Sequence, residues 1–444
     1  MGLFIQITTF VLIISILVIL HELGHFIPAK LFKTKVEKFY LFFDPWFSIV
    51  KKKVGDTVYG IGWLPLGGYV KIAGMIDESM DKEQMEKPPE PWEFRSKPAW
   101  QRLIIMLGGV IVNFLLAWVI YISMFVYYGE TYIPVDQIED GLYVDKISEQ
   151  IGFRTGDKIL EIDGNKVEKL DKYLTIDILL GDEVTVLRDG KEETVLLSDE
   201  GKKAALDSKG RNFVTPRYRS LVIGNIVDTL NAKQSGIKVG DELVSVNNDK
   251  LVFWDEFVES LDENRGNSID LVVKRDGQLV NLNAQIDEKE PFGVINNRRL
   301  AVQDLFVTKE YGFFEAVPRG FEETINVLVR QVKQFKLIFN PVIQGYKKVK
   351  GPIGIVEMMP PVWEWQFFWG FMAMFSVWLA FLNILPIPAL DGGHVMFLLY
   401  EIIVGKAPSQ KVMEIGQIVG FVIIMSLMVV IFGNDIWNLI KGGS

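Results

Sequence analysis

Residues 3–25 read LFIQITTFVLIISILVILHELGH, and this stretch decides the fold that the sequence predicts. Its first eighteen residues carry no charge. At about 1.5 Å per residue they are long enough for a helix that crosses a bilayer core of roughly 30 Å. Further apolar stretches of similar length lie at residues 103–128, 367–390 and 415–432. We therefore expect a polytopic α-helical membrane protein with four transmembrane helices.

The composition indicates apolar spans that alternate with a charged soluble part. The 444 residues are 49% hydrophobic and 23% charged, with a mean hydropathy of +0.22. The net charge of −9 argues against nucleic acid as a partner, and the absence of cysteine excludes disulfides and thiolate ligands. A cleaved signal peptide is the alternative for the first span, but residues 1–10 contain no basic residue and no small-residue cleavage site follows.

The distribution of charge predicts the topology. Basic residues are frequent before the second span, whereas acidic residues follow it, and basic loops usually remain cytoplasmic. Residues 30–102 should then be cytoplasmic and residues 129–366 outside, with both termini facing outward. The basic residues include Lys30, Lys33, Lys35, Lys38, Lys51, Lys52, Lys53, Arg95, Lys97 and Arg102.

The outer region contains a repeat. Residues 151–164, IGFRTGDKILEIDG, return as residues 235–248, SGIKVGDELVSVNN. Farther along, Arg188-Asp-Gly aligns with Arg275-Asp-Gly, each between β-branched runs that predict two strands joined by an Asp-Gly turn. The Gly-x-x-x-Gly-Asp pattern resembles the PDZ domain, a small β-domain whose groove accepts a peptide as an added strand. We expect two tandem PDZ-like domains of unknown ligand; the alternative is two β-domains that only pack together.

Residues 313–344 place apolar side chains at helical spacing, with an interruption expected at Pro318. Such an amphipathic helix can lie along the membrane or line the route to a site, or it can pack on the second β-domain. The predicted parts in chain order are helix 1 at 1–30, a membrane-associated β-hairpin region at 31–102, helix 2 at 103–128, PDZ-like domains at 129–215 and 216–305, a helical segment outside the membrane at 306–366, helix 3 at 367–400 and helix 4 at 415–437.

The segment HELGH at residues 21–25 has the pattern of a zinc site. His21 and His25 are four residues apart and share one helical face, and Glu22 between them can reach metal-bound water. Ionisable groups are costly in a membrane helix unless they pair, bind a metal or face a cavity. The only other histidine of the chain, His394, ends the second unusual segment.

That second segment is NILPIPALDGGH at residues 383–394, at the inner end of the third span. Pro386 and Pro388 remove backbone donors, so the helix must unwind or kink there. Asp391 supplies an anionic oxygen and, with the two imidazoles, completes a three-ligand zinc site with one position open for water. The predicted topology places HELGH and Asp391 at the same side of the membrane. His394 is expected to support the site or lie at the interface and not to bind the metal.

These residues predict hydrolysis of a peptide bond. Zinc would lower the pKa of its water, and Glu22 would take the proton and deliver it to the departing amine. Asn383 is a candidate to hold the substrate backbone or the oxyanion; the alternative is a hydrogen bond between packed helices.

HELGH, NILPIPALDGG, Gly109-x-x-x-Asn113 and Gly351-Pro-Ile-Gly354 together resemble the site-2 protease family of intramembrane metalloproteases. The resemblance covers nearly the whole chain. It implies a Zn²⁺ cofactor, contact of Pro386 and Pro388 with substrate, and residence in the inner membrane of a Gram-negative cell. It also implies cleavage of single-span membrane proteins, typically an anti-sigma factor, and disposal of remnant signal peptides.

The glycine-rich residues 60–74 gain a role from this resemblance, because in the family such a segment dips into the membrane as a hairpin. An edge strand there could pair with an unwound substrate, which places Gly67, Gly68 and Tyr69 near it. An ordinary cytoplasmic hairpin is the alternative.

Two other classes of function compete with proteolysis. A membrane-anchored PDZ scaffold would leave the histidines incidental, and a metal transporter would be expected to show repeated membrane helices, which the sequence lacks.

Overall fold

The computed structural model describes residues 1–75, 88–207, 214–217, 219–297 and 305–442, and the chain divides into two units. Unit 1 comprises Met1–Gly129, Glu310–Ile338 and the residues from Tyr346 onward. Unit 2 comprises Glu130–Lys309 and Phe339–Gly345.

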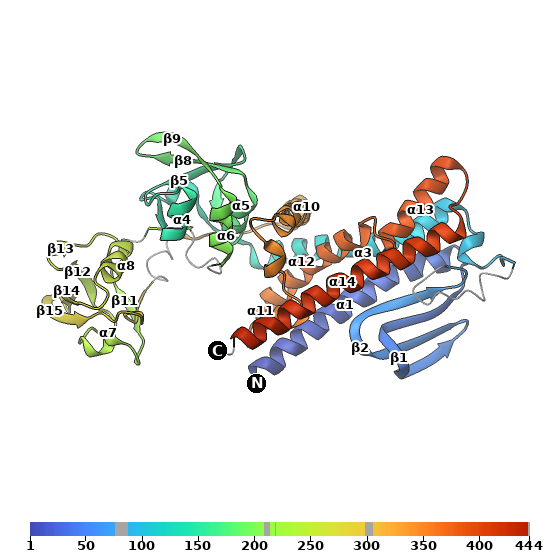
Figure 1. Ribbon diagram of the computed structural model, residues 1–444, viewed down its shortest axis with the longest axis horizontal. Helices are drawn as coiled ribbons and strands as arrows, with labels where there is room; N and C mark the ends of the chain where they lie inside the picture. Colours follow the sequence, from blue (N-terminus) through green and yellow to red (C-terminus); the bar gives the residue numbers. More distant parts are fainter. Residues whose placement is uncertain (76–87, 208–213, 218, 298–304, 443–444) are drawn as a thin grey trace. The chain divides into compact units, whose positions relative to one another are not determined.

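Within the described residues of unit 1, four helices are long and apolar enough to cross a membrane (Figure 1). They are α1 (Gly2–Leu31), α3 (Ala99–Tyr128), α12 (Trp365–Ile384) and α14 (Gln410–Gly442). Only 11% to 39% of each apolar window is buried, which fits helices whose outer faces meet lipid. The prediction of four membrane helices is confirmed.

Helices α1 and α3 cross closely because glycine stands at the contact on both. A Cβ on Gly24 would overlap the Gly108 carbonyl, and a Cβ on Gly108 would overlap the Gly24 carbonyl. Farther along, an apolar core joins α1, α3 and α12. Its fully buried members include Ile13, Leu17, Ala117 and Ala373.

The third predicted span, residues 367–400, is not one helix. Helix α12 ends at Ile384, residues 385–390 form a turn, and a separate helix α13 (Asp391–Val404) follows. Leu385 has φ −58° and ψ 142°, the extended conformation that a following proline favours. The unwinding expected at the two prolines is therefore present, and it divides the span in two.

The amphipathic helix is uninterrupted and ends five residues before the predicted end at residue 344. Helix α10 (Phe313–Phe339) continues through Pro318, so the predicted interruption is wrong. The missing N–H of Pro318 would have bonded the carbonyl of Phe314, which is 88% exposed at the start of the helix, so the loss there is small. The helix packs on unit 1: Phe321 contacts Phe114 and Trp118 of α3 edge-to-face. The rest of this region contains η4 (Gly345–Lys348) and α11 (Pro352–Met358).

Strands β1 (Val36–Val54) and β2 (Thr57–Ile72) form a sheet beside α1 (Figure 1). Both strands bend back on themselves, because Leu41 pairs with Ile61 on one side and with Gly68 on the other. The sheet thus has four segments in the order 48–54, 57–62, 36–43 and 68–72. Segment 68–72 is the outermost of these four segments on one side of the sheet. A short 3-10 helix, η1 (Phe94–Ser96), precedes α3.

The sheet runs along α1. At one end Lys30 of α1 donates a hydrogen bond to Thr57, 2.9 Å between Nζ and Oγ1. Toward the other end, a Cβ on Gly68 would lie 2.5 Å from Val18 Cγ1. Stacked aromatic rings of Trp46, Phe47 and Trp63 lie beyond that point. One end of the sheet is therefore rich in lysine, and the other is aromatic and lies beside the apolar part of α1.

Unit 2 contains two four-stranded antiparallel sheets with the same strand order, β6-β5-β8-β9 and β13-β12-β14-β15. The first domain consists of β3 (Glu130–Pro134), η2 (Val135–Gln137), β4 (Leu142–Val144), α4 (Lys146–Ile151), β5 (Lys158–Ile162), β6 (Asn165–Lys166), β7 (Lys169–Leu170), α5 (Leu174–Leu180), β8 (Glu183–Arg188), β9 (Lys191–Leu196), α6 (Asp199–Asp207) and β10 (Val214–Pro216). The second consists of β11 (Ile223–Ile226), α7 (Asn231–Gln234), β12 (Glu242–Val246), β13 (Asp249–Lys250), α8 (Trp254–Glu263), β14 (Ser268–Arg275), β15 (Gln278–Gln285) and β16 (Val294–Asn296).

The same buried ion pair holds each of the two sheets, which explains the residues shared by the sequence repeat. In the first domain, Arg188 donates to both oxygens of Asp157 at 2.8 and 2.7 Å and to the Gly152 carbonyl at 2.9 Å. In the second, Arg275 donates to Asp241 and to the Gly236 carbonyl at 2.7 to 2.8 Å. A bidentate arginine–carboxylate pair fixes both distance and orientation.

Two predicted boundaries change. Strand β10 pairs with β4 and includes Pro216, so the first domain extends past residue 215. Strand β17 (Val307–Lys309) pairs with β3, so residues 307–309 belong beside the first domain and not to a helical segment. The predicted end of the second domain at residue 305 adjoins residues 298–304, which lie outside the described residues.

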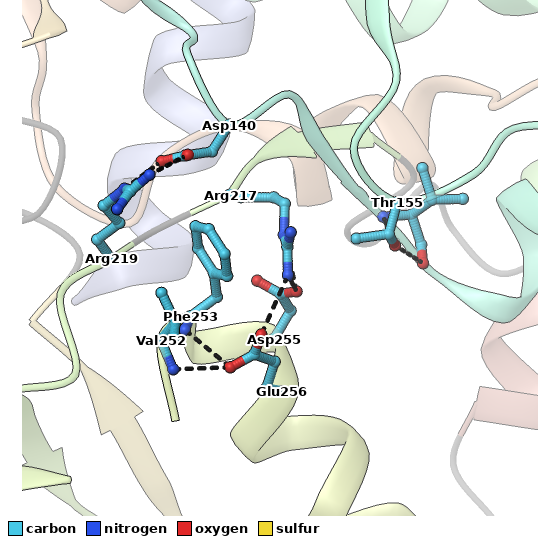
Figure 2. Close-up of polar contacts among 9 residues, drawn as sticks. Asp140, Thr155, Arg217, Arg219, Val252, Phe253, Asp255 and Glu256 are labelled. Atoms are coloured by element: carbon cyan, nitrogen blue, oxygen red, sulfur yellow. Dashed lines mark hydrogen bonds and ion pairs between the residues drawn. The ribbon is translucent and has the colours of Figure 1, made fainter. Parts of the chain in front are cut away.

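The linker between the two β-domains carries two paired arginines (Figure 2). Arg217 donates to Asp255 at 2.7 Å, and its guanidinium carbon lies 3.6 Å from the ring centre of Phe253. Arg219 donates through Nε to Asp140 at 2.6 Å, and these hydrogen bonds hold the pKa of Asp140 below its ordinary value. The linker is thus fixed by charged contacts on both of its sides.

Candidate metal centre

Helix α1 places His21 and His25 one turn apart with their rings edge-to-face, 4.8 Å between centres and 85° between planes. Both side chains are largely buried, at 13% and 8% exposed. The i, i+4 spacing puts both imidazoles on one face of the helix, as the sequence predicts.

Asp391, the first residue of α13, reaches both histidines. Its Oδ2 lies 3.3 Å from His21 Nε2 and 3.2 Å from His25 Nε2, and the two nitrogens are 3.3 Å apart. Among the described residues this is the group that could hold a metal ion. The unwound turn at residues 385–390 thus brings the predicted third residue to the two on α1.

The spacing of these three atoms fits a tetrahedral zinc ion. With bonds of about 2.0–2.1 Å, such an ion holds its ligand atoms about 3.3–3.4 Å apart. Asp391 Oδ2 is buried and has no hydrogen-bond donor within the described part of the chain. A buried anionic oxygen between two imidazole nitrogens is stabilised by a cation shared among them.

The far side of each imidazole supports metal binding. His25 Nδ1 lies 2.8 Å from the carbonyl oxygen of Ile105, which can only accept, so Nδ1 carries the proton and Nε2 presents a lone pair. His21 Nδ1 faces Asn113, whose Oδ1 is buried without a partner in the described structure. An amide flip of Asn113 places that oxygen on the Nδ1–H of His21 and satisfies both groups.

Gly109 lies directly against the two imidazoles. A Cβ there would be 2.5 Å from both His21 Cε1 and His25 Nε2, so any side chain would displace the rings. Helix α3 therefore contributes a glycine, a carbonyl and an amide to the centre. Gly109-x-x-x-Asn113 is visible in the sequence as a spacing, but its roles at the centre are not, and Ile105 is not predictable because its carbonyl gives no sequence signal.

Glu22 lies beside the centre and beside the edge of the sheet. It is 9% exposed, and its Cγ would be 3.6 Å from a Cβ on Gly68. Glu22 is not one of the three metal-binding candidates. It is a carboxylate next to a potential metal position and next to an edge segment of the sheet.

Comparison with known proteins identifies the family. The model of peptidase family M50 matches residues 9–427. The chain belongs to peptidase family M50. It is a metalloprotease, and the resemblance to site-2 proteases that its motifs predict is confirmed.

The relatives of this M50 peptidase match it from end to end. A protein of Pasteurella multocida, provisionally named as a zinc metalloprotease, is 30% identical over 452 residues, covering 97% of this chain and 98% of its own. The regulator of sigma-E protease RseP of Escherichia coli is 27% identical over 461 residues, covering 98% and 99%. The regulator of sigma E protease of Haemophilus influenzae is also 27% identical over 461 residues.

The remaining predicted site residues of the M50 peptidase lie at different distances from the centre. Asn383 is close, with Nδ2 3.3 Å from His21 Nε2. Pro386 and Pro388 form the turn, and Pro388 lies against Gly416 of α14. Their contact with substrate stays a prediction. His394 lies outside the metal group, with Nε2 3.0 Å from Gln417 Nε2.

Gly67, Gly68 and Tyr69 lie at or next to the outermost segment on one side of the sheet. Gly67 has φ 143°, a conformation that side chains rarely adopt. The Tyr69 hydroxyl donates to Asp44 at 2.8 Å and its ring stacks on Tyr40, so this side chain packs on the sheet. The Tyr69 ring is thus held against the sheet, and the backbone of Gly68 is the part of this segment that lies near Glu22.

Proposed function

We propose that this M50 peptidase is an intramembrane zinc metalloendopeptidase that hydrolyses peptide bonds within transmembrane segments of single-span membrane proteins. The observation that carries the proposal is the triangle of His21, His25 and Asp391, spaced for a tetrahedral metal on helices apolar enough to span a bilayer. The E. coli relative is named a regulator of sigma-E protease, which supports substrates of the anti-sigma-factor type. Remnant signal peptides are the second substrate class, and the inner membrane is the proposed location.

In this proposal His21, His25 and Asp391 would hold Zn²⁺, which would supply an activated water and a Lewis acid for the scissile carbonyl. Ile105 and Asn113 keep the two imidazoles in the tautomer that leaves Nε2 free. Glu22 accepts the proton of the water and returns it to the leaving amine nitrogen. Asn383 donates a hydrogen bond to the substrate carbonyl or to the oxyanion that develops from it.

Metal removal tests the function. The purified protein, in proteoliposomes with a single-span substrate, should lose cleavage when a zinc chelator is added and regain it when Zn²⁺ is restored. Cleavage within the substrate's transmembrane segment is read by mass spectrometry of the products. A metal-free protein that cuts at the original rate, or cuts confined to residues outside the bilayer, would overturn the proposal.

The edge of the sheet is proposed to hold the substrate extended. A helix shields its own backbone, so the substrate must unwind before hydrolysis, and pairing with segment 68–72 would replace its lost hydrogen bonds. The nearness of Gly68 to Glu22 supports this, because a strand added at this edge would pass the general base.

Proline at Tyr69 or Val70 should therefore impair cleavage more than alanine does. Neighbouring residues of a strand direct their N–H groups to opposite edges of that strand. One of these two residues therefore directs its N–H group away from the sheet, toward a strand that would be added there. Losing a bond to a buried substrate carbonyl costs about 1–3 kcal/mol, or roughly ten- to hundredfold in rate. The measurement is the cleavage rate at unchanged zinc content, with substrates that do and do not contain a central Gly-Pro.

Two controls accompany this comparison. Tyr69→Phe keeps the stacking on Tyr40 and removes only the bond to Asp44. A helix-breaking Gly-Pro in the substrate should partly rescue the proline variants, because it lowers the cost of unwinding. Equal rates for alanine and proline at both positions, without rescue, would leave this segment an ordinary cytoplasmic hairpin.

The PDZ-like domains are proposed to select substrates from outside the membrane. Every proposed catalytic residue lies in unit 1, so removal of residues 135–305 should spare hydrolysis and change which substrates are cut. Strands β3 and β17 would remain, and their pairing of Tyr132 with Val307 brings the new ends together. A shortened protein that binds zinc but cuts no substrate, even one with an unstructured tail, would show that the domains belong to the catalytic machinery.

A further inference from the structure

Helix α14 lies directly against the turn that leads to Asp391. A Cβ on Gly420 would overlap the carbonyl oxygen of Pro388, and a Cβ on Gly416 would lie 3.5 Å from Pro388 Cγ and 3.1 Å from the Phe397 ring. The two glycines are one helical turn apart, so together they let the backbone of α14 rest on the turn.

A polar contact lies between the same two segments. Gln417 is 6% exposed although it sits in an apolar helix, and its Nε2 is 3.0 Å from His394 Nε2. His394 is on the first turn of α13, three residues after Asp391. Thus α14 contacts the chain both before and after Asp391.

These contacts are local. Only 11% of the apolar window of α14 is buried, and Gly433, farther along the same helix, has open space around its Cβ position. Two prolines remove N–H donors from the turn, which keeps backbone hydrogen bonds from Ile387 to Leu385 and from Leu390 to Ile387. The packing of α14 adds a constraint on the turn from outside it.

We propose that Gly420, Gly416 and Gln417 are positioning residues that set the place of Asp391 in the metal centre. The inference rests on the proposed role of Asp391 as a ligand. Asp391 Oδ2 must stay within 3.2 to 3.3 Å of both histidine nitrogens, so a shift of Pro388 by the width of a methyl group would open the triangle. Residues that orient a metal ligand typically change metal affinity about 10- to 100-fold when lost.

In competition with a chelator, Gly420→Ala should bind zinc at least about tenfold more weakly than the wild type does. Its kcat should be reduced and its KM nearly unchanged. Gln417→Met, which keeps the size of the side chain and removes its polar group, should act in the same direction with a smaller effect. Gly433→Ala is the matched control and should retain zinc and activity, because its Cβ meets nothing within 4 Å.

Three measurements are made on each full-length variant: zinc retention against chelator, kcat and KM, and the thermal midpoint of the metal-free protein. A purely structural role would lower the metal-free midpoint without weakening zinc selectively. Asp391→Asn is included to separate the two claims. If Asp391→Asn retains zinc, the ligand assignment fails and this inference with it. If Asp391→Asn loses zinc while Gly420→Ala and Gln417→Met retain it, only the positioning role is overturned. If Gly420→Ala does not fold, the zinc retention of Gln417→Met decides the result.

Discussion

Replacing Glu22 by glutamine is expected to abolish cleavage while the protein still folds and binds zinc. The amide keeps the size and shape of the carboxylate, so the packing beside Gly68 is preserved, but it cannot accept the proton of a water molecule. Loss of a general base typically costs about 10²- to 10⁴-fold in rate. The measurement is the single-turnover cleavage rate in proteoliposomes together with the zinc content of the same sample.

Glu22→Asp is a useful companion, because it keeps the charge and withdraws the carboxylate by one methylene. It should retain more activity than glutamine if proton transfer is the role of this side chain. A Glu22→Gln protein that cuts at nearly the original rate would remove Glu22 from the mechanism. It would do so without affecting the assignment of the metal ligands, since Glu22 is not in that group.

The residues that local spacing controls were predictable from the sequence. His21 and His25 share a face because residues four apart lie on the same side of a helix. The number of membrane helices was predictable because each apolar stretch is long enough to cross a bilayer. The unwinding at residues 385–390 was predictable for the same reason, since Pro386 and Pro388 act on the backbone next to them.

Contacts between distant segments were harder to predict. The carbonyl of Ile105 orients His25 across 80 residues of sequence, and every residue has such a carbonyl. The four-segment sheet could not be derived either. The segment that contains Leu41 pairs with a neighbour on each side, but its alternation of apolar and polar residues is the same as in a simple hairpin. The interruption predicted at Pro318 is wrong because the free-energy cost of a proline depends on its position within the helix.

Asp391 was predicted as a ligand from its chemistry and its side of the membrane, and its position agrees with that choice. In our proposal the α14 contacts help to hold this aspartate, at the start of α13, near two histidines on another helix. Gly420 had no such meaning in the sequence, where it is one small residue in an apolar span. Its importance depends on the Pro388 carbonyl, which only the fold brings beside it.

Asp391→Asn is expected to cause the largest loss of zinc. A neutral amide oxygen is a poorer ligand than a carboxylate, and the amide nitrogen can also donate hydrogen bonds to the lone pairs of His21 Nε2 and His25 Nε2, now 3.2 to 3.3 Å away. The variant should therefore hold its two histidines together without metal, fold normally, and bind zinc at least about 100-fold more weakly than the wild type.

The measurement is zinc affinity by competition with a chelator of known strength, beside the cleavage rate. Glu22→Gln is the control, because it should lose cleavage and keep zinc, whereas Asp391→Asn should lose both. Raising the Zn²⁺ concentration should restore part of the activity of Asp391→Asn and none of Glu22→Gln, since only the first defect is one of occupancy. Full zinc affinity in Asp391→Asn would mean that the carboxylate is not the third ligand, and that the short distances from its Oδ2 to the two histidines belong to an ion pair.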